Sequence, residues 1–259
     1  MATLRQTDVL DPARATALDV ILGHRRGDDG LPPFYHQIYF WDPEPPQALG
    51  RDGHPRVGGL IPDMGLPRRM WAGGALTFHV PLQVGAKAEK ISRCLKSERK
   101  TGRSGPLGFV TLEHQIHQNG VLCVTERQDL VYRMDHDPTA PKPSSPEARR
   151  DSVVQRHISF DSTMLFRYSA LTFNGHRIHY DLAYAREVEG YDGLVVHGPL
   201  LAQLLMLLAA EGGCLASFEF RATAPLLHFE AALVCQNDKD LWIAGPDGRR
   251  CMQAQVAYK

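Results

Sequence analysis

The chain has 259 residues, enough for one large domain or two small ones, and its 29 basic side chains balance 29 acidic ones to a formal net charge of zero. This balance excludes the overall positive field that nucleic-acid binding favours, and no stretch is long and apolar enough to cross a bilayer. The five cysteines lack a CxxC spacing, so we expect reduced, buried thiols and no structural metal. The N-terminal residues lack the features of a secretory or transit segment, which predicts a cytoplasmic protein.

The N-terminal half begins with a helix signal and continues into strands. Asp11 and Pro12 are an N-cap and a first-turn proline ahead of a helix that should end near Leu22. The following residues, to about position 70, are rich in glycine, proline and aromatic residues, and 34–41 is the only strand-like run among them. Further strands are predicted at 75–84, 88–98, 108–118 and 121–133, with Asn119-Gly120 as a hairpin turn. This half therefore predicts an antiparallel meander.

A proline-rich stretch, PTAPKPSSPE at 138–147, is typical of a linker. We therefore expect an N-terminal domain over residues 1–140 and a C-terminal domain over residues 150–259. In the second of these, strands are predicted near 217–223, 227–236, 241–244 and 252–258. A curved antiparallel sheet around a central helix fits this half, and the first half has enough strands for a degenerate copy.

A polar cluster follows the short apolar run at 164–173. Asn174, His176 and His179 are expected where a strand or loop enters a helical turn, a place from which side chains can point into a cleft. Histidine can take or give a proton near neutral pH at little cost. The amide of Asn174 cannot transfer a proton, but it can orient a water molecule.

A helix start comes shortly after this cluster, at Val196-His197-Gly198-Pro199. Proline suits the first position of a helix, and Gly198 lets a ligand approach the backbone closely. The helix that follows, to residue 210, has Gln203 as its only polar residue, so it should be buried. Backbone amides at the start of such a helix are natural donors to a carbonyl oxygen that gains negative charge.

The spacing of these residues resembles the hydratase motif of the MaoC-like, R-specific enoyl-CoA hydratases, in which an Asp and a His five positions apart precede an Ile/Val-His-Gly helix start. Asn174 and His179 keep that spacing here. The resemblance implies that His179 is the catalytic base or acid and that the N–H of Gly198 binds the thioester carbonyl. The chain departs from the pattern at Asn174, where those hydratases carry Asp, so one titrating group is lost.

The amino-acid sequence of residues 168–181 is similar to that of the type 2 hydroxyacyl-thioester dehydratases and of the bacterial mesaconyl-CoA and itaconyl-CoA hydratases. Residues 31–41 and 67–74 also resemble the first domain of that group, so the resemblance covers most of the chain. It implies an α+β double hotdog fold, with two curved antiparallel sheets that each wrap a helix and with the motif in the C-terminal one. It further implies a cofactor-independent hydro-lyase that adds water to a short, dicarboxylic α,β-unsaturated acyl-CoA, with a homodimer as the candidate assembly.

Other interpretations stay open. A 3-hydroxyacyl-thioester dehydratase of fatty acid synthesis and a thioesterase use the same fold, although the Asn-to-His spacing and the helix start favour hydration. A non-catalytic subunit that binds acyl thioesters is the alternative from another class, because the Asn at position 174 is a change by which such sites lose activity.

Several further residues are candidates for contacts with the substrate. Arg177 stands where the related motif has Pro, and its guanidinium could pair bidentately with a second carboxylate. Arg69 and Arg221, together with Arg68, are candidates for binding the substrate or the phosphates of coenzyme A, and Trp71 opens a run that could admit the pantetheine arm.

Two more histidines need a role. His176 falls where the hydratases usually carry an Asn that organises the loop, so a structural role is favoured over a substrate contact, and His197 is expected to pack at the helix entry. The pair formed by His176 and His179 has no third His, Cys or carboxylate at a convincing interval, so the sequence predicts no metal site.

Overall fold

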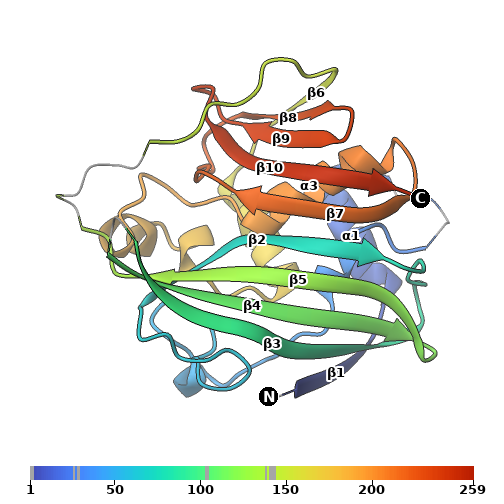
Figure 1. Ribbon diagram of the computed structural model, residues 1–259, viewed down its shortest axis with the longest axis horizontal. Helices are drawn as coiled ribbons and strands as arrows, with labels where there is room; N and C mark the ends of the chain where they lie inside the picture. Colours follow the sequence, from blue (N-terminus) through green and yellow to red (C-terminus); the bar gives the residue numbers. More distant parts are fainter. Residues whose placement is uncertain (1–2, 26, 28–29, 103–104, 138, 140–143) are drawn as a thin grey trace.

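The computed structural model describes residues 3–25, 27, 30–102, 105–137, 139 and 144–259. One antiparallel sheet of ten strands runs through this part of the chain in the order β1-β3-β4-β5-β2-β7-β10-β9-β8-β6, and the helices lie behind it in Figure 1. The strands are β1 (Thr3–Val9), β2 (Arg68–Phe78), β3 (Lys87–Gly102), β4 (Gly105–Gln118), β5 (Val121–Arg133), β6 (Val154–Ile158), β7 (Leu215–Ala222), β8 (Ala232–Asn237), β9 (Asp240–Ala244) and β10 (Arg250–Tyr258). The helices are α1 (Pro12–Leu22), α2 (Ser162–Thr172) and α3 (Gly198–Ala210), and the short helical turns are η1 (Tyr35–Ile38), η2 (Pro46–Ala48), η3 (Arg177–His179) and η4 (Tyr184–Val188). No helix in the described ranges combines the length and the apolar composition that crossing a membrane requires.

The two halves of the sheet repeat one topology. The order β1-β3-β4-β5-β2 in the first half corresponds strand for strand to β6-β8-β9-β10-β7 in the second. In each half the first strand leads into a helix with an aspartate N-cap, Asp11 for α1 and Asp161 for α2. The halves meet where β2 pairs with β7, and α1 packs against α2. A division at 1–140 and 150–259 follows this repeat and stays a proposal, because one apolar core contains residues of both halves.

Helix α3 is the centre of the second half. It contacts β7, β8, β9 and β10, and Leu200, Ala202, Leu205 and Met206 have no exposed surface. Its apolar composition therefore predicted its burial correctly. Gln203, the single polar side chain within it, is also buried and donates to the backbone oxygen of Pro33 at 2.9 Å.

The first half differs from the second between its first helix and its next strand. The described residues between α1 and β2 form short turns such as the four-residue η1, whereas the second half has α3 in the corresponding place. The expected strand at 34–41 is wrong. Phe34 and Phe40, near the two ends of this run, have positive φ angles of 70° and 59°, which fit neither a strand nor a continuous helix. Burial of the aromatic side chains, rather than backbone pairing, accounts for the apolar run.

Local signals placed most other elements correctly. The side chain of Asp11 accepts from the backbone N–H of Ala13, and Asn119-Gly120 joins β4 to β5 with φ angles of 50° and 77°. Several boundaries need correction. Strand β2 runs over Arg68–Phe78 rather than 75–84, and β8 begins at Ala232 rather than at 227. The edge strands β1 and β6 were not expected, and the apolar run at 164–173 lies mostly within α2 because Asp161 caps a helix there.

Candidate active site

Three buried histidines meet where η3 faces the start of α3. The rings of His179 and His197 are stacked with centroids 3.6 Å apart, and the ring of His176 lies edge-on to His179 at 5.4 Å. His197 directly precedes Gly198, the first residue of α3, so the stack fixes His179 beside the helix start. The fold thus brings together the two parts of the motif that the sequence separates by sixteen residues or more.

His179 is held as a neutral base. Its Nδ1 lies 2.7 Å from the backbone oxygen of Val195. A carbonyl oxygen can only accept a hydrogen bond, so Nδ1 carries the hydrogen and the neutral ring presents a lone pair at Nε2. Burial lowers the pKa of His179 to about 3, against the raising effect of the Val195 carbonyl. At neutral pH the ring is therefore unprotonated.

His197 supports this arrangement from the opposite side. Its Nε2 lies 2.8 Å from the hydroxyl of Ser169 on α2, and the ring of Tyr168 meets it edge-on. Burial lowers its pKa well below the usual value, and the proximity of His179 adds to the effect. His197 packs at the helix entry, as its position in the sequence led us to expect.

Asn174 is fixed just after the end of α2. Its backbone N–H donates to the oxygen of Ser169 at 2.8 Å, and its side-chain oxygen accepts from the backbone N–H of His176 at 3.0 Å. The side chain borders a cavity of about 560 Å³. An amide held in this way can orient a water molecule at the edge of that cavity, and His176 organises the loop that holds it.

Gly198 is the first residue of α3. The first four N–H groups of a helix have no partner within it, so the N–H of Gly198 has none within α3. Apart from its chain neighbours and the backbone of α3 itself, a Cβ atom added at Gly198 would lie nearest the backbone oxygen of Trp71, at the ordinary contact distance of 3.7 Å. Trp71 itself is anchored by a hydrogen bond from its indole N–H to the oxygen of Gly73 and contacts Phe34 and Phe220.

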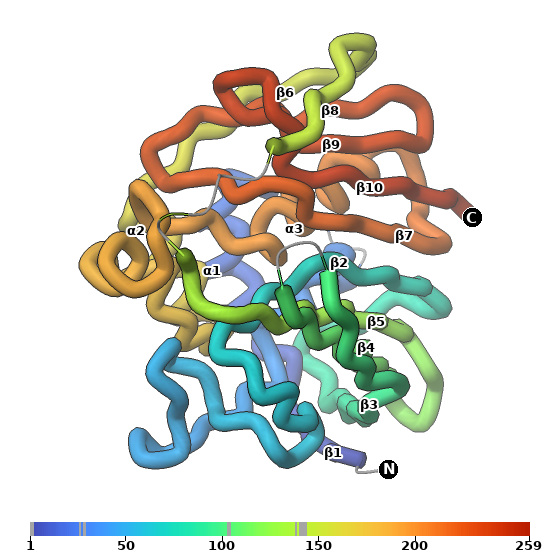
Figure 2. The backbone as a smooth tube through the Cα atoms, turned by 60° about the vertical axis from the view of Figure 1, so that its left-hand side comes forward, coloured from blue at the N-terminus to red at the C-terminus, as the bar shows by residue number. Residues whose placement is uncertain are grey.

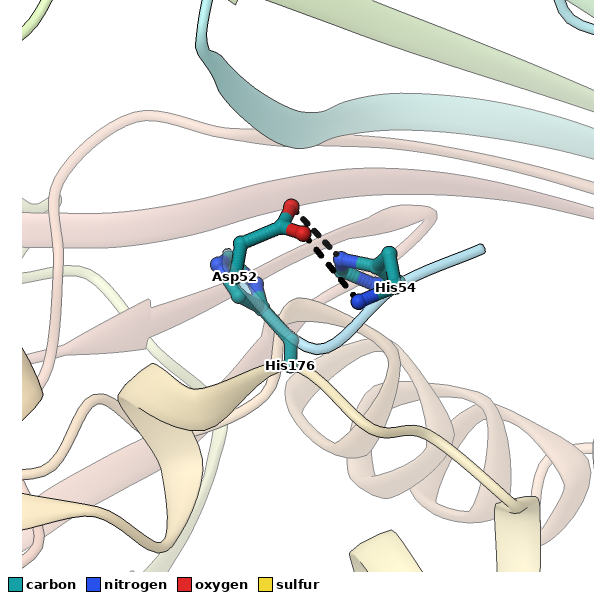
Figure 3. Close-up of side chains that lie close together, drawn as sticks. All are labelled: Asp52, His54 and His176. Atoms are coloured by element: carbon teal, nitrogen blue, oxygen red, sulfur yellow. Dashed lines mark hydrogen bonds and ion pairs between the residues drawn. The ribbon is translucent and has the colours of Figure 1, made fainter. Parts of the chain in front are cut away.

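Two residues that the sequence did not point to complete the site. Asp52 and His54 lie in the loop between η2 and β2, and Figure 3 shows them directed toward each other beside His176. The Oδ2 of Asp52 is 3.1 Å from the Nδ1 of His54, whose ring centroid is 4.6 Å from that of His176. Figure 2 shows this loop, in light blue, on the same side of the molecule as α2.

Two glycines hold the loop against the motif. A Cβ atom at Gly53 would lie 2.0 Å from the oxygen of Gly175, and one at Gly175 would lie 2.4 Å from the oxygen of Gly53. Only glycine permits such an approach, and Gly53 also has a φ of +86°. The backbone N–H of Arg177 then donates to the oxygen of Asp52 at 2.9 Å. The loop that contains Asp52 and His54 has no periodic pattern. The sequence therefore did not predict that it lies beside the motif.

The pKa values of this cluster reflect burial and one nearby cation. Burial and then the charge of Arg69 lower the pKa of His54 to about 4, although Asp52 and Asn174 act in the opposite direction. Burial is also the main cause that lowers the pKa of His176, with His54, His179 and Arg69 contributing. Burial raises the pKa of Asp52, but hydrogen bonds and charge from His54, with Arg69, bring it below its usual value.

The cluster also has the spacing of a metal site, since one donor atom from each of Asp52, His54 and His176 lies within 4.8 Å of the others. Intervals along the sequence did not reveal this group because two of its members come from the first half of the chain. However, the charge of Arg69 acts on all three side chains, and it would oppose a divalent cation. The donor set therefore fits a metal less well than its spacing alone indicates.

The candidate arginines have different surroundings. Arg177 is ion-paired with Asp181, at 2.6 Å, and lies over the ring of Tyr184, so its guanidinium is engaged within the chain. Arg68 is buried in an ion pair with Glu189. Arg221 is exposed in a separate groove of about 400 Å³ with Arg149 and Asp240, and it is not part of the histidine cluster. Arg69 is the one whose charge reaches the histidines.

The cavity beside Asn174 has an aromatic wall and a polar floor. Phe40, Trp41, Phe166 and Phe173 line it, with Trp41 stacked on Phe173 at 5.2 Å. Polar residues of β3, β4 and β5 also line it, namely Lys90, His114, Glu126 and Gln128. The cavity thus extends from the first half of the sheet to the loops that carry Asn174 and His54.

The buried histidines predict that acid destabilises the fold. His54, His114, His176, His179 and His197 all have pKa values lowered chiefly by burial, to about 4 for His54 and His114 and about 3 for His179. The unfolded chain binds protons below about pH 6.5 while the folded chain does not, so stability is lost as the pH falls from about 6.5 toward 4. Each group contributes up to about 1.4 kcal/mol per pH unit in that window.

Urea unfolding at about pH 7 and about pH 5 measures this effect. His114→Gln should reduce the difference between the two pH values, whereas His157→Gln, at an exposed position on β6, should leave it unchanged. A free energy of unfolding that stays level or rises on acidification would contradict the assignment of neutral buried rings.

The sequence matches the family model of hydroxyacyl-thioester dehydratase type 2 over residues 34–228. It is 44% identical over 253 residues to the mesaconyl-C(4)-CoA hydratase of Chloroflexus aurantiacus, covering 94% of this chain and 89% of that protein. It is 28% identical over 244 residues to the mitochondrial hydroxyacyl-thioester dehydratase type 2 of Schizosaccharomyces pombe, covering 82% and 80% of the two chains.

Solved structures share the fold at lower identity. HtdX from Mycobacterium tuberculosis superimposes with a TM-score of 0.71 at 16% identity, and the match covers all of both chains. A second protein of that organism, described as a double hotdog fold, has a TM-score of 0.58 at 12% identity and covers 99% of this chain and 95% of its own. With the repeated strand order, these matches establish a double hotdog fold.

Proposed function

Because the chain belongs to the hydroxyacyl-thioester dehydratase type 2 family, we propose that it is a hydro-lyase that adds water to an α,β-unsaturated acyl-CoA. One observation carries the proposal. His179 is buried, neutral and held by the oxygen of Val195, and its ring stacks on His197, the residue before Gly198 at the start of α3, which supports a proton acceptor near the Gly198 N–H. A proton acceptor next to an oxyanion donor is what hydration of an enoyl thioester requires.

In the proposed mechanism, Asn174 holds a water molecule at the edge of the cavity. Nε2 of His179 takes a proton from this water as its oxygen bonds to the β-carbon, and the thioester becomes an enolate. The N–H of Gly198, assisted by the dipole of α3, stabilises the negative oxygen. The His179 imidazolium then returns its proton to the α-carbon, so one residue carries both transfers and the proton balance closes. His176 is assigned to holding the loop rather than to the reaction.

Mesaconyl-C4-CoA, hydrated to citramalyl-CoA, is the proposed substrate. The similarity to the hydratase from Chloroflexus aurantiacus supports this choice, since it extends over nearly the whole of both chains. Itaconyl-CoA, which would place the protein in itaconate degradation, is the second dicarboxylic candidate. Cytoplasmic location and a homodimeric state stay predictions from the sequence.

The wild-type protein should hydrate mesaconyl-C4-CoA with a higher kcat/KM than crotonyl-CoA. The measurement follows the loss of enoyl-thioester absorbance with mesaconyl-C4-, itaconyl- and crotonyl-CoA, and mass spectrometry identifies the hydrated product. Absence of turnover with all three thioesters, in protein shown to be folded, would overturn the proposal and favour a non-catalytic subunit that binds acyl thioesters.

The alternative of a 3-hydroxyacyl-thioester dehydratase has distant support, from 28% identity to the Schizosaccharomyces pombe protein. It predicts a preference for longer monocarboxylic chains over mesaconyl-C4-CoA. The same assay, extended to 2-enoyl thioesters of increasing chain length, distinguishes the two activities.

A further inference from the structure

Arg69 and Tyr132 face each other across two strands of the first half. The register of β2 and β5 pairs them directly, so their side chains lie on the same face of the sheet. Tyr132 is 3% exposed, and its hydroxyl is buried without a hydrogen-bond acceptor among the described residues. Burial raises the pKa of Tyr132, against the effect of the neighbouring Arg69. The phenol is therefore a protonated donor whose hydrogen is unused.

The guanidinium of Arg69 is also incompletely paired. Its neighbour Arg68 forms a buried ion pair with Glu189, and Arg177 forms a partly exposed ion pair with Asp181, but Arg69 has no carboxylate partner of either kind in the described ranges. Asp52 is the acidic group whose charge Arg69 affects, and its oxygens already accept from the ring and the backbone N–H of His54. A half-buried guanidinium next to an unused phenol hydrogen is suited to an anionic oxygen acceptor.

We propose that Arg69 and Tyr132 bind the free carboxylate of a dicarboxylic acyl-CoA substrate. The proposal rests on the hydratase function given above and names its specificity-determining residues. It replaces Arg177, which the sequence offered as a candidate for this role, because the ion pair with Asp181 already engages the guanidinium of Arg177.

The chemistry of the substrate fits this position. In mesaconyl-C4-CoA the free carboxylate is attached to the β-carbon, the atom to which water adds, so the carboxylate must bind close to the group that holds the water. Arg69 is near enough to His54 and His176 to lower the pKa of both, and both neighbour Asn174. A carboxylate bound at Arg69 and Tyr132 would thus place the β-carbon on the side of the proposed water.

The test compares two substrates that differ in this carboxylate. Arg69→Met should raise KM for mesaconyl-C4-CoA roughly ten- to a hundredfold, the range for a hydrogen-bonded charge, and change KM for crotonyl-CoA little. Tyr132→Phe should act in the same direction by a smaller factor. Arg127→Met is the matched control, since Arg127 lies on the same strand as Tyr132 but is exposed and paired with Asp129. Equal effects of Arg69→Met on both substrates would overturn the proposal.

A binding experiment separates this proposal from the hydratase assignment. Calorimetric titration with succinyl-CoA and butyryl-CoA, which are saturated and cannot be hydrated, should show tighter binding of succinyl-CoA to the wild type and loss of that preference in Arg69→Met. Arg69→Lys, which keeps the charge but not the bidentate geometry, should retain part of the preference and serves if the methionine variant does not fold.

A wild type that turns over neither enoyl thioester but prefers succinyl-CoA would refute the hydratase function alone. A wild type that hydrates mesaconyl-C4-CoA but shows no such preference would refute the carboxylate site alone.

Discussion

Replacing His179 by alanine should lower kcat for hydration of mesaconyl-C4-CoA by about 10²- to 10⁴-fold, the usual contribution of a general acid–base residue. The upper part of the range is expected because Asn174 cannot titrate. The motif therefore has no carboxylate at position 174 that could carry the proton in place of His179. Steady-state kinetics with the purified variant measure the loss, and a thermal melt shows whether the protein remains folded.

The control for this variant is His157→Ala, which removes an exposed imidazole from β6 and should keep wild-type turnover. His179→Gln tests the same point with less loss of volume in the buried stack on His197. Near-normal kcat in a folded His179→Ala protein would remove His179 from the mechanism. The low pKa of about 3 for this residue adds a second expectation, that kcat/KM does not fall through titration of His179 until the protein itself becomes unstable in acid.

The second large effect is expected from Gly198→Pro, which removes the N–H of the first residue of α3. Proline suits the first position of a helix, and His197 before it has φ −60° and ψ 130°, which proline allows in the preceding residue. Position 198 also precedes Pro199, which disfavours helical angles for any residue with a Cβ atom, so Gly198→Ala controls for that strain. The loss of one oxyanion donor typically lowers kcat by about 10²- to 10³-fold, or roughly 3 to 4 kcal/mol. Turnover of enoyl thioesters, together with a melting curve, measures it.

Gly198→Ala is the companion variant, because it adds a methyl group but keeps the N–H. A Cβ atom there would meet only the oxygen of Trp71 at 3.7 Å, so most of the activity should remain. Equal losses in the alanine and proline variants would show that Gly198 matters for the space in front of it rather than for its hydrogen bond.

The site is assembled from both halves of the double hotdog, and this explains how a chain that lacks the motif carboxylate can still hold an ordered polar site. Asp52 supplies a carboxylate from the other half, bonded to His54 rather than placed at position 174. The Gly53 and Gly175 backbones are in contact, so the two loops are positioned relative to each other by close packing. Asn174 therefore lies close to polar side chains contributed by the first half of the chain.

The first half shows where local patterns fail. Apolar residues dominate the run at 34–41 and predict a strand. The run instead contains the helical turn η1, and its apolar side chains pack into the core. Its burial comes from contacts of η1 with α1 and α2 and of Phe34 with Trp71 and Phe220. Most of these partners lie far away in the sequence, and local composition cannot distinguish such packing from strand pairing. Residues of η1 also line the cavity beside Asn174.

The arginines give a second example. All four candidates are cations, and composition alone does not distinguish them. Their surroundings differ because Glu189 and Asp181 neutralise Arg68 and Arg177, Arg221 lies in another groove, and Arg69 pairs across β2 and β5 with the buried Tyr132. Such pairings depend on strand register and on loops that meet in space, which the order of residues does not reveal.

The sequence by itself determined the features that depend on neighbours within a few positions. These are the Asp11 cap, the Asn119-Gly120 turn, the buried helix that begins at Gly198, and the motif spacing that singled out His179. The tertiary structure alone decided which distant groups join them, because the docking of Asp52 and His54 and the pairing of Arg69 with Tyr132 arise from loop packing and strand register. Caps, turns and periodic patterns depend on residues that are close in the sequence, so they can be predicted from it. The close approach of remote backbone segments is fixed only when the whole sheet has formed.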